Sequence, residues 1–159
     1  MTHKTMNLRP KIALYEPDIP QNTAAIIRTC SCFAINLEII EPCGFIFNDK
    51  KFKRVVMDYL DEKMIKFYSD YNEFFKTKKK KKEKIILMTT KATKSYNTFN
   101  FNLNDTILFG RESAGVPEKI HRSVDKRLKI PLSNEKRSLN LASSVAIVLA
   151  ESIRQNNLF

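Results

Sequence analysis

The sequence has little cysteine, histidine and glycine, and its apolar runs are short. The three cysteines, Cys30, Cys32 and Cys43, include no CxxC pair, and only two histidines could supplement them as metal ligands. We therefore expect reduced, structural thiols and no metal site.

The longest apolar runs, such as 145–150, fall far short of the roughly 20 residues that cross a bilayer. No apolar segment of the secretory kind follows the first ten residues, so we expect no membrane partner and a cytoplasmic location.

The length and the charge set further bounds. A chain of 159 residues that is 43% apolar has the size of one domain, which we expect to span residues 11–159 after an N-terminal extension at 1–10. The formal net charge is +11, and neutralising phosphates with cations releases counterions. A nucleic-acid partner is the leading prediction, although a composition rich in Lys, Asn, Ile and Phe can also follow from an AT-rich coding sequence.

Short apolar runs alternate with helical patterns along the chain. The runs suit strands that are buried on both faces, and they occupy 12–15, 37–40, 85–88, 106–109 and 128–131. Helical patterns occupy 23–33, 51–61, 70–80, 117–124 and 139–154. This alternation predicts an α/β fold, with a parallel sheet flanked by helices.

Polar residues at the starts of three helical patterns are candidate caps. Asn22 could cap the first helix, Asp70 the third, and Ser138 or Asn140 the last, each by offering a side-chain oxygen to backbone N–H groups. Lysines fill 76–84, broken only by a threonine and a glutamate. We predict a solvated loop there; it could contact an RNA backbone or be a variable, mobile surface insertion.

Two of only three glycines fall in one segment, FGRESAGVP at 109–117. Average usage of about 7% would give roughly eleven glycines. Glycine is retained where φ is positive or where a ligand approaches the backbone, so this segment predicts a ligand loop at the carboxyl end of a strand. The alternative is a plain turn in which Pro117 starts the next helix. The segment is neither a Walker A loop nor a GxGxxG fingerprint, which argues against nucleotide hydrolysis and NAD chemistry.

Three other polar segments follow predicted strands, at 16–22, 88–91 and 130–141. Loops at the carboxyl ends of parallel strands converge, so all of them could share one crevice with the glycine-containing segment, or only some could. Arg28 is a charge within an apolar helical pattern. Such arginines are often snorkelling or salt-bridged, and the alternative is a functional role.

Three motifs carry a family resemblance: EPDIPQNT at 16–23 with IIR at 26–28, LFGRESAGVP at 108–117, and IPLSNEKRSLNL at 130–141. In this order and spacing they resemble the motifs of the SPOUT-class, TrmH-like RNA 2'-O-methyltransferases. The resemblance runs from about residue 11 to 155. It is greatest to the small, single-domain enzymes that methylate the wobble ribose of tRNA, the tRNA (cytidine(34)-2'-O)-methyltransferases of the TrmL/YibK type.

The resemblance implies a deep trefoil knot in the C-terminal third, an exception to the rule that chains avoid threading. It implies transfer of a methyl group from S-adenosylmethionine to the 2'-hydroxyl of cytidine or uridine 34 of tRNA. The expected substrates are leucine tRNAs, bound through their anticodon stem-loop. It also implies a homodimer in which the first and last helices form much of the interface. The positions that match the family's cofactor-binding residues are Met88, Thr89, Gly110, Ile130, Leu132, Ser138 and Leu139.

The same resemblance implies catalytic roles for Arg28, Asn22, Glu112, Ser138 and Asn140. A guanidinium pKa exceeds roughly 12, so we expect Arg28 to orient phosphate and stabilise a developing alkoxide as a cation. Asn22 would orient the ribose or cap its helix. Glu112 would pair with Arg28 or support the cofactor loop, and Ser138 and Asn140 would line the nucleotide pocket.

The chain departs from the family pattern at three positions. Ala24 and Ala34 stand where the family has glycine, and Arg111 stands where it has proline. None of these changes removes a polar motif residue. Methylation of another tRNA or rRNA site, and a catalytically idle knotted RNA-binding protein, are the alternative functions.

Overall fold

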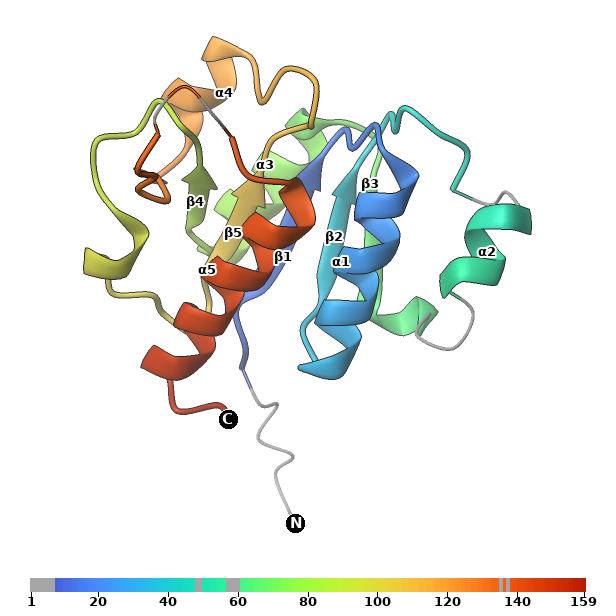
Figure 1. Ribbon diagram of the computed structural model, residues 1–159, viewed down its shortest axis with the longest axis horizontal. Helices are drawn as coiled ribbons and strands as arrows, with labels where there is room; N and C mark the ends of the chain where they lie inside the picture. The colour runs from blue at the N-terminus through green and yellow to red at the C-terminus, as the bar shows by residue number, and fades with distance from the viewer. Residues whose placement is uncertain (1–7, 48–49, 57–60, 135, 137) are drawn as a thin grey trace.

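The computed structural model describes residues 8–47, 50–56, 61–134, 136 and 138–159. Most of the predicted N-terminal extension, part of the helix predicted at 51–61 and two positions of the third motif lie outside these residues. Within them, the predicted fold class is confirmed: a parallel sheet carries helices on both faces (Figure 1).

All strand pairings in the six-stranded sheet are parallel. The strands, in the spatial order β3-β2-β1-β5-β4-β6, are β3 (Ile65–Tyr68), β2 (Leu37–Ile40), β1 (Lys11–Tyr15), β5 (Thr106–Phe109), β4 (Ile85–Met88) and β6 (Lys126–Leu128). In the centre, Ile12 lies opposite Leu37 on one side and Ile107 on the other. From β1 the chain adds β2 and then β3 on one side, and it places β4, β5 and β6 on the other side. The strand order therefore reverses between β1 and β5.

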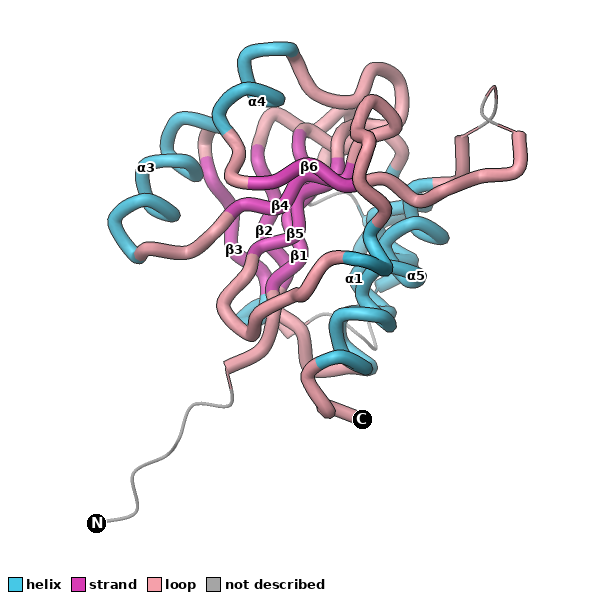
Figure 2. The backbone as a smooth tube through the Cα atoms, turned by 90° about the vertical axis from the view of Figure 1, so that its left-hand side faces the viewer, coloured by secondary structure: helices cyan, strands magenta, loops and turns pink. Residues whose placement is uncertain are grey.

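Helices cover both faces of the sheet, as the side view in Figure 2 shows. One face packs against α1 (Pro20–Cys32), α2 (Lys50–Val56) and α5 (Leu141–Gln155), and the other against α3 (Tyr71–Lys81) and α4 (Glu118–Ser123). Short 3-10 turns occur at Glu62–Met64 and Tyr96–Thr98. Alternate residues of β1 enter the two cores: Ile12 and Leu14 join the first and Ala13 the second.

The sheet differs from the sequence prediction at its two edges. β3 was missed because only part of the four-residue segment is apolar, and Lys66 and Phe67 are exposed on this edge strand. The strand predicted at 128–131 is wrong in its position. β6 ends at Leu128, since the next N–H, of Lys129, donates to Lys94 O (2.9 Å).

The helix caps follow the predictions at two of three positions. Asp70 accepts a hydrogen bond from Glu73 N (2.8 Å), and Asn140 accepts one from Ser143 N (3.2 Å), so both caps are confirmed. The cap predicted for Asn22 is wrong. α1 begins earlier, with Pro20 in its first turn and Ile19 at the cap position, which leaves the Asn22 amide for tertiary contacts.

The solvated loop predicted for the lysine run is also wrong. α3 continues to Lys81, and Lys78 is buried at its inward face, one turn after the buried Phe74. Its ammonium group lies 2.6 Å from Glu38 Oε1 and 2.7 Å from Glu83 Oε2. A run of like charges concealed the helical periodicity, because one lysine of the run pairs in the core instead of facing water.

Candidate functional site

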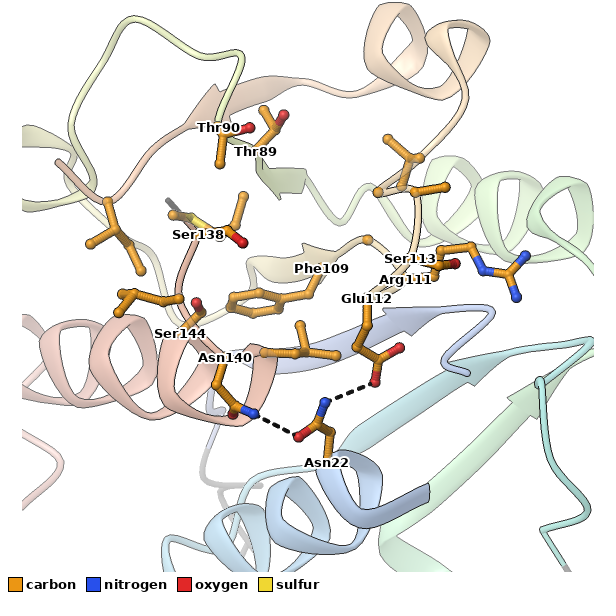
Figure 3. Close-up of a pocket in the computed structure, with 18 of the residues that line it drawn as sticks. Asn22, Thr89, Thr90, Phe109, Arg111, Glu112, Ser113, Ser138, Asn140 and Ser144 are labelled. Carbon is orange, nitrogen blue, oxygen red and sulfur yellow. Dashed lines mark hydrogen bonds between the residues drawn. The ribbon is translucent and has the colours of Figure 1, made fainter. Parts of the chain in front are cut away.

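A cavity of about 430 Å³ opens at the carboxyl ends of β4, β5 and β6, beside the starts of α1 and α5 (Figure 3). Its volume suits a small organic ligand. It is lined by Ile19 and Asn22, by residues 87–90 and 109–116, by Ile130 and Leu132, and by residues 138–141 with Ser144. Segments far apart in the sequence therefore share one crevice beside the point where the strand order reverses.

The loop after β5 owes its shape to its two glycines. Arg111 N donates to Gly115 O (3.1 Å) and Gly115 N donates to Arg111 O (2.8 Å), which closes a tight turn. A Cβ at Gly110 would lie 2.6 Å from the backbone of Gly115, and Gly115 itself has φ 63°. Neither position accepts a side chain without strain.

The predicted cofactor residues come together in this cavity. All of them line it: Met88, Thr89, Gly110, Ile130, Leu132, Ser138 and Leu139. The apolar members could flank a planar ring, while backbone groups and the hydroxyls of Thr89 and Ser138 offer hydrogen bonds to polar edges. Ser144 also lines the cavity although the sequence analysis did not single it out; its place one helical turn after Asn140 is the signal that could have found it.

A chain of side-chain hydrogen bonds joins the first motif to the second and third. Asn140 Nδ2 donates to Asn22 Oδ1 (2.9 Å), and Asn22 Nδ2 donates to Glu112 Oε1 (3.3 Å), as the dashed lines in Figure 3 mark. Asn140 Oδ1 is occupied by its cap with Ser143 N. These contacts hold the starts of α1 and α5 and the loop after β5 in one arrangement.

Asp18 extends this chain outside the cavity and was missed by the sequence analysis. Its backbone N–H donates to Glu112 Oε2 (2.9 Å), and its carboxylate accepts a hydrogen bond from Ser113 Oγ and lies 3.3 Å from Arg111 Nε. Burial and the interaction with the Asp18 carboxylate raise the pKa of Glu112, against the opposing hydrogen bond from Asp18 N–H, whereas the Glu112 carboxyl group, with help from Ser113 and Arg111, lowers the pKa of Asp18 to about 2. Of the two carboxyl groups, Glu112 holds a proton to higher pH.

Of the predicted catalytic residues, Asn22, Glu112, Ser138 and Asn140 line the cavity. Arg28 does not line it and is exposed, six residues along α1 from Asn22. The structure of one chain thus brings together four of the five predicted side chains.

The described part of the chain contains neither a metal-ion cluster nor a membrane-spanning helix. No group of three His, Cys, Asp or Glu side chains there could hold a metal ion. Among these residues, no helix is long and apolar enough to span a bilayer.

Comparisons with known proteins give a family and close relatives. The profile of the SpoU rRNA Methylase family matches residues 9–150. A tRNA (cytidine(34)-2'-O)-methyltransferase from Beijerinckia indica subsp. indica is 44% identical over 144 residues, covering 91% of this chain and 90% of that protein. Another from Escherichia coli (strain K12) is 34% identical over 146 residues, covering 91% and 92%.

Solved structures agree with these sequence comparisons. One described as "structural insights into the 2-OH methylation of C/U34 on tRNA" superposes with a TM-score of 0.88 at 30% identity, covering 95% of this chain and 98% of that chain. An AdoMet-bound rRNA methyltransferase from Sinorhizobium meliloti shows the same fold, with a TM-score of 0.82 at 22% identity, covering 92% of this chain and 56% of that chain.

Proposed function

The chain belongs to the SpoU rRNA methylase family, and we propose that it transfers a methyl group from S-adenosylmethionine to the ribose 2'-hydroxyl of the wobble nucleotide, cytidine or uridine 34, of tRNA. The observation that carries this proposal is that relatives named for this activity match nine tenths of the chain, at 34% to 44% identity. The proposal includes the trefoil knot that the family resemblance implies for the C-terminal third.

The cavity fits the cofactor. Its volume of about 430 Å³ and its mixture of apolar side chains with backbone and hydroxyl groups suit a molecule with an adenine ring, a ribose and an amino-acid tail. Gly110 keeps the turn that lines this cavity closed, because a side chain there would collide with the backbone of Gly115. When bound, the cofactor supplies a methyl group on a sulfonium, which is an electrophile with a neutral leaving group.

The hydrogen-bonded chain of Asn22, Asn140 and Glu112 would position the acceptor ribose at the edge of this cavity. Fixed amides can hold a hydroxyl in line with the methyl group without reorganising during the reaction, and such positioning contributes much of the rate in group transfer. Glu112 would keep Asn22 oriented, and Ser138 would line the nucleotide pocket. Arg28 would act as a cation on phosphate and developing alkoxide.

A homodimer accounts for the exposed position of Arg28. α1 and α5 lie side by side on the surface of one chain (Figure 1), and α5 exposes the small and apolar residues Ala146, Ile147 and Ala150. Burying this face against a second copy would remove apolar area from water, and it would give Arg28 of one subunit a route to the cavity of the other. We therefore propose that the acceptor site is composed from two chains.

Nucleoside mass spectrometry tests the reaction. Purified protein is incubated with S-adenosylmethionine and unmodified or native tRNA, including leucine tRNAs, and any 2'-O-methyl group is mapped to its position. We expect methylation at position 34 with the wild type and a loss of at least 100-fold with Arg28→Ala, while the exposed Arg122→Ala serves as the control. Methylation at another position would overturn the substrate, and no methylation of any RNA would favour an idle RNA-binding protein.

Light scattering tests the dimer. We expect the wild type to have twice the mass of the chain, and Ile147→Asp, which places a charge on the exposed face of α5, to be monomeric and inactive. A monomeric wild type that is fully active would contradict the composite site.

A further inference from the structure

A second surface, on the opposite half of the sheet from the cavity, combines exposed apolar side chains with cations. It consists of Ile46 in the loop after β2, of Lys50, Lys53, Arg54 and Val55 on α2, and of Phe67 on the edge strand β3. We call it the α2 surface. Ile46 is 75% exposed, Val55 68% and Phe67 39%, values that isolated surface residues also reach. Two features distinguish the α2 surface: packed aromatic rings lie beneath it, and α2 contributes cations to it without any acidic residue.

An aromatic cluster beneath the α2 surface supports it. The Phe47 ring lies 4.6 Å from that of Phe52 and 4.8 Å from that of Phe67, in an edge-to-face arrangement with the latter. Phe52 is buried and also contacts Phe45, with 5.3 Å between ring centroids. Packed rings of this kind lose little freedom when a partner binds. The exposed edge of Phe67 is therefore a pre-organised contact.

The charges favour a polyanion as the partner. α2 has the sequence KKFKRVV, with four cations and no acidic residue. A second copy of this chain that docked the same surface against itself would place these cations next to like charges, which is costly. Cations interleaved with exposed apolar and aromatic groups are instead typical of surfaces that bind flexible single strands of nucleic acid.

The loops after β1 and β2, at the carboxyl edge of the sheet, lie between the α2 surface and the cavity. Gly44 N donates to Pro17 O (2.9 Å), and a Cβ at Gly44 would lie 2.6 Å from Asp18 Cβ, so the loop after β2 packs tightly on the loop after β1. Asp18 in turn donates to Glu112 at the cavity. β3 is three strands away from β5 in the sheet, a separation of about 15 Å at the usual strand spacing. A few nucleotides of single-stranded RNA span that distance.

We propose that the α2 surface binds the RNA substrate next to its target nucleotide, with phosphates on Lys50, Lys53 and Arg54 and an unpaired base or ribose against Val55 and Phe67. This inference rests on the proposed function only in taking RNA as the substrate. The α2 surface would bind the nucleotides that flank the reacting ribose.

Direct binding of tRNA at several salt concentrations tests the inference with two matched variants. The first is Lys50→Ala with Lys53→Ala and Arg54→Ala; the second removes the same charge from exposed positions of α3, by Lys76→Ala with Lys80→Ala and Lys81→Ala. Each lost phosphate contact lowers the slope of log affinity against log salt by about 0.7 to 0.9. We expect the α2 variant to lose about two units of slope and to raise KM for tRNA at least 10-fold, with kcat at saturating tRNA unchanged. The α3 variant should lose less than one unit.

Val55→Glu gives a second measurement, because it adds a charge at an exposed position without removing a core side chain. We expect weaker tRNA binding and an unchanged molecular mass in light scattering. A change of mass would identify the α2 surface as a protein interface and overturn the inference, as would equal losses in the two triple variants. If the wild type methylates tRNA and the α2 variant binds tRNA as the wild type does, only this inference is contradicted. If tRNA binding depends on the α2 surface but the wild type methylates no RNA, only the proposed function is contradicted.

Discussion

Replacing Lys78 should reveal how strongly the buried charge cluster holds α3 to the sheet. Its side chain is 1% exposed and its ammonium group contacts Glu38 at 2.6 Å and Glu83 at 2.7 Å. Lys78→Met retains most of the apolar stem but leaves a buried carboxylate without its partner. Removing one member of a buried ion pair costs about 3–5 kcal/mol, a large share of a typical free energy of unfolding of about 5–15 kcal/mol.

Urea or guanidinium unfolding of Lys78→Met and of Lys80→Met, an exposed neighbour on the same helix, measures this effect. We expect the second variant to change the free energy of unfolding by no more than about 0.5 kcal/mol. Adding Glu38→Met to Lys78→Met should recover at least half of the loss, because Glu83 still has Lys11 at 3.1 Å. Equal, small losses in the two lysine variants would refute the reasoning.

The pH dependence supplies an independent check. Burial of Glu83 would raise its pKa, but the hydrogen bonds and charges of Lys78 and Lys11 outweigh burial, so its pKa is lowered in the folded state. A lowered carboxyl pKa gives stability that is present above the unfolded value of about 4.3 and is lost as pH falls through the folded value. The variant lacks part of this contribution, because Glu83 loses one of the two cations that lower its pKa. The difference between wild type and Lys78→Met should therefore be larger at pH 8 than at pH 4.

Three further predictions concern single positions. Ala34 has φ 53° at the end of α1, so Ala34→Gly should raise the free energy of unfolding by about 1 kcal/mol, and an unchanged or lower denaturation midpoint would contradict this. Gly110→Ala should abolish binding of S-adenosylmethionine in calorimetry, because its Cβ would lie 2.6 Å from the Gly115 backbone; undiminished affinity would contradict it. Burial raises the pKa of Cys30 to about 12 and that of Cys43 to about 11. Thiol titration at pH 8 should therefore find no more than one reactive cysteine in the native protein and three in denaturant, and a second fast thiol would be evidence against it.

Much of the fold could be predicted because its central strands are short, continuous apolar runs. The centres of β1, β2, β4 and β5 are buried, and apart from Lys11 and Thr106 at the strand starts, Glu38 is the one polar residue that interrupts the apolar pattern. The edges escaped prediction because partial exposure breaks the pattern in β3. Glu38 and Lys78 escaped for a different reason: each looks like a surface residue until a partner 40 positions away is brought to it.

The residues of the candidate site were also predictable only in part. The positions of Gly110 and Gly115 could be predicted because a turn with positive φ and a close backbone contact requires glycine. The contacts of Asp18 could not, since they depend on β1 pairing with β5, and no local pattern encodes which strands become neighbours. Arg28 lies outside the cavity of its own chain, so its predicted role depends on the dimer that we propose, which a single sequence cannot display.

The order of the strands explains how so small a protein could hold a cofactor and a large substrate together. The loops after β4, β5 and β6 on one half of the sheet enclose the cavity, and the loop after β2 on the other half leads to the α2 surface. Asn22 and Glu112 meet where the two halves separate, between β1 and β5. Loops diverge at such a switch point and leave room for a ligand group. A reacting ribose placed there would face the cofactor on one side and have its flanking nucleotides supported on the other.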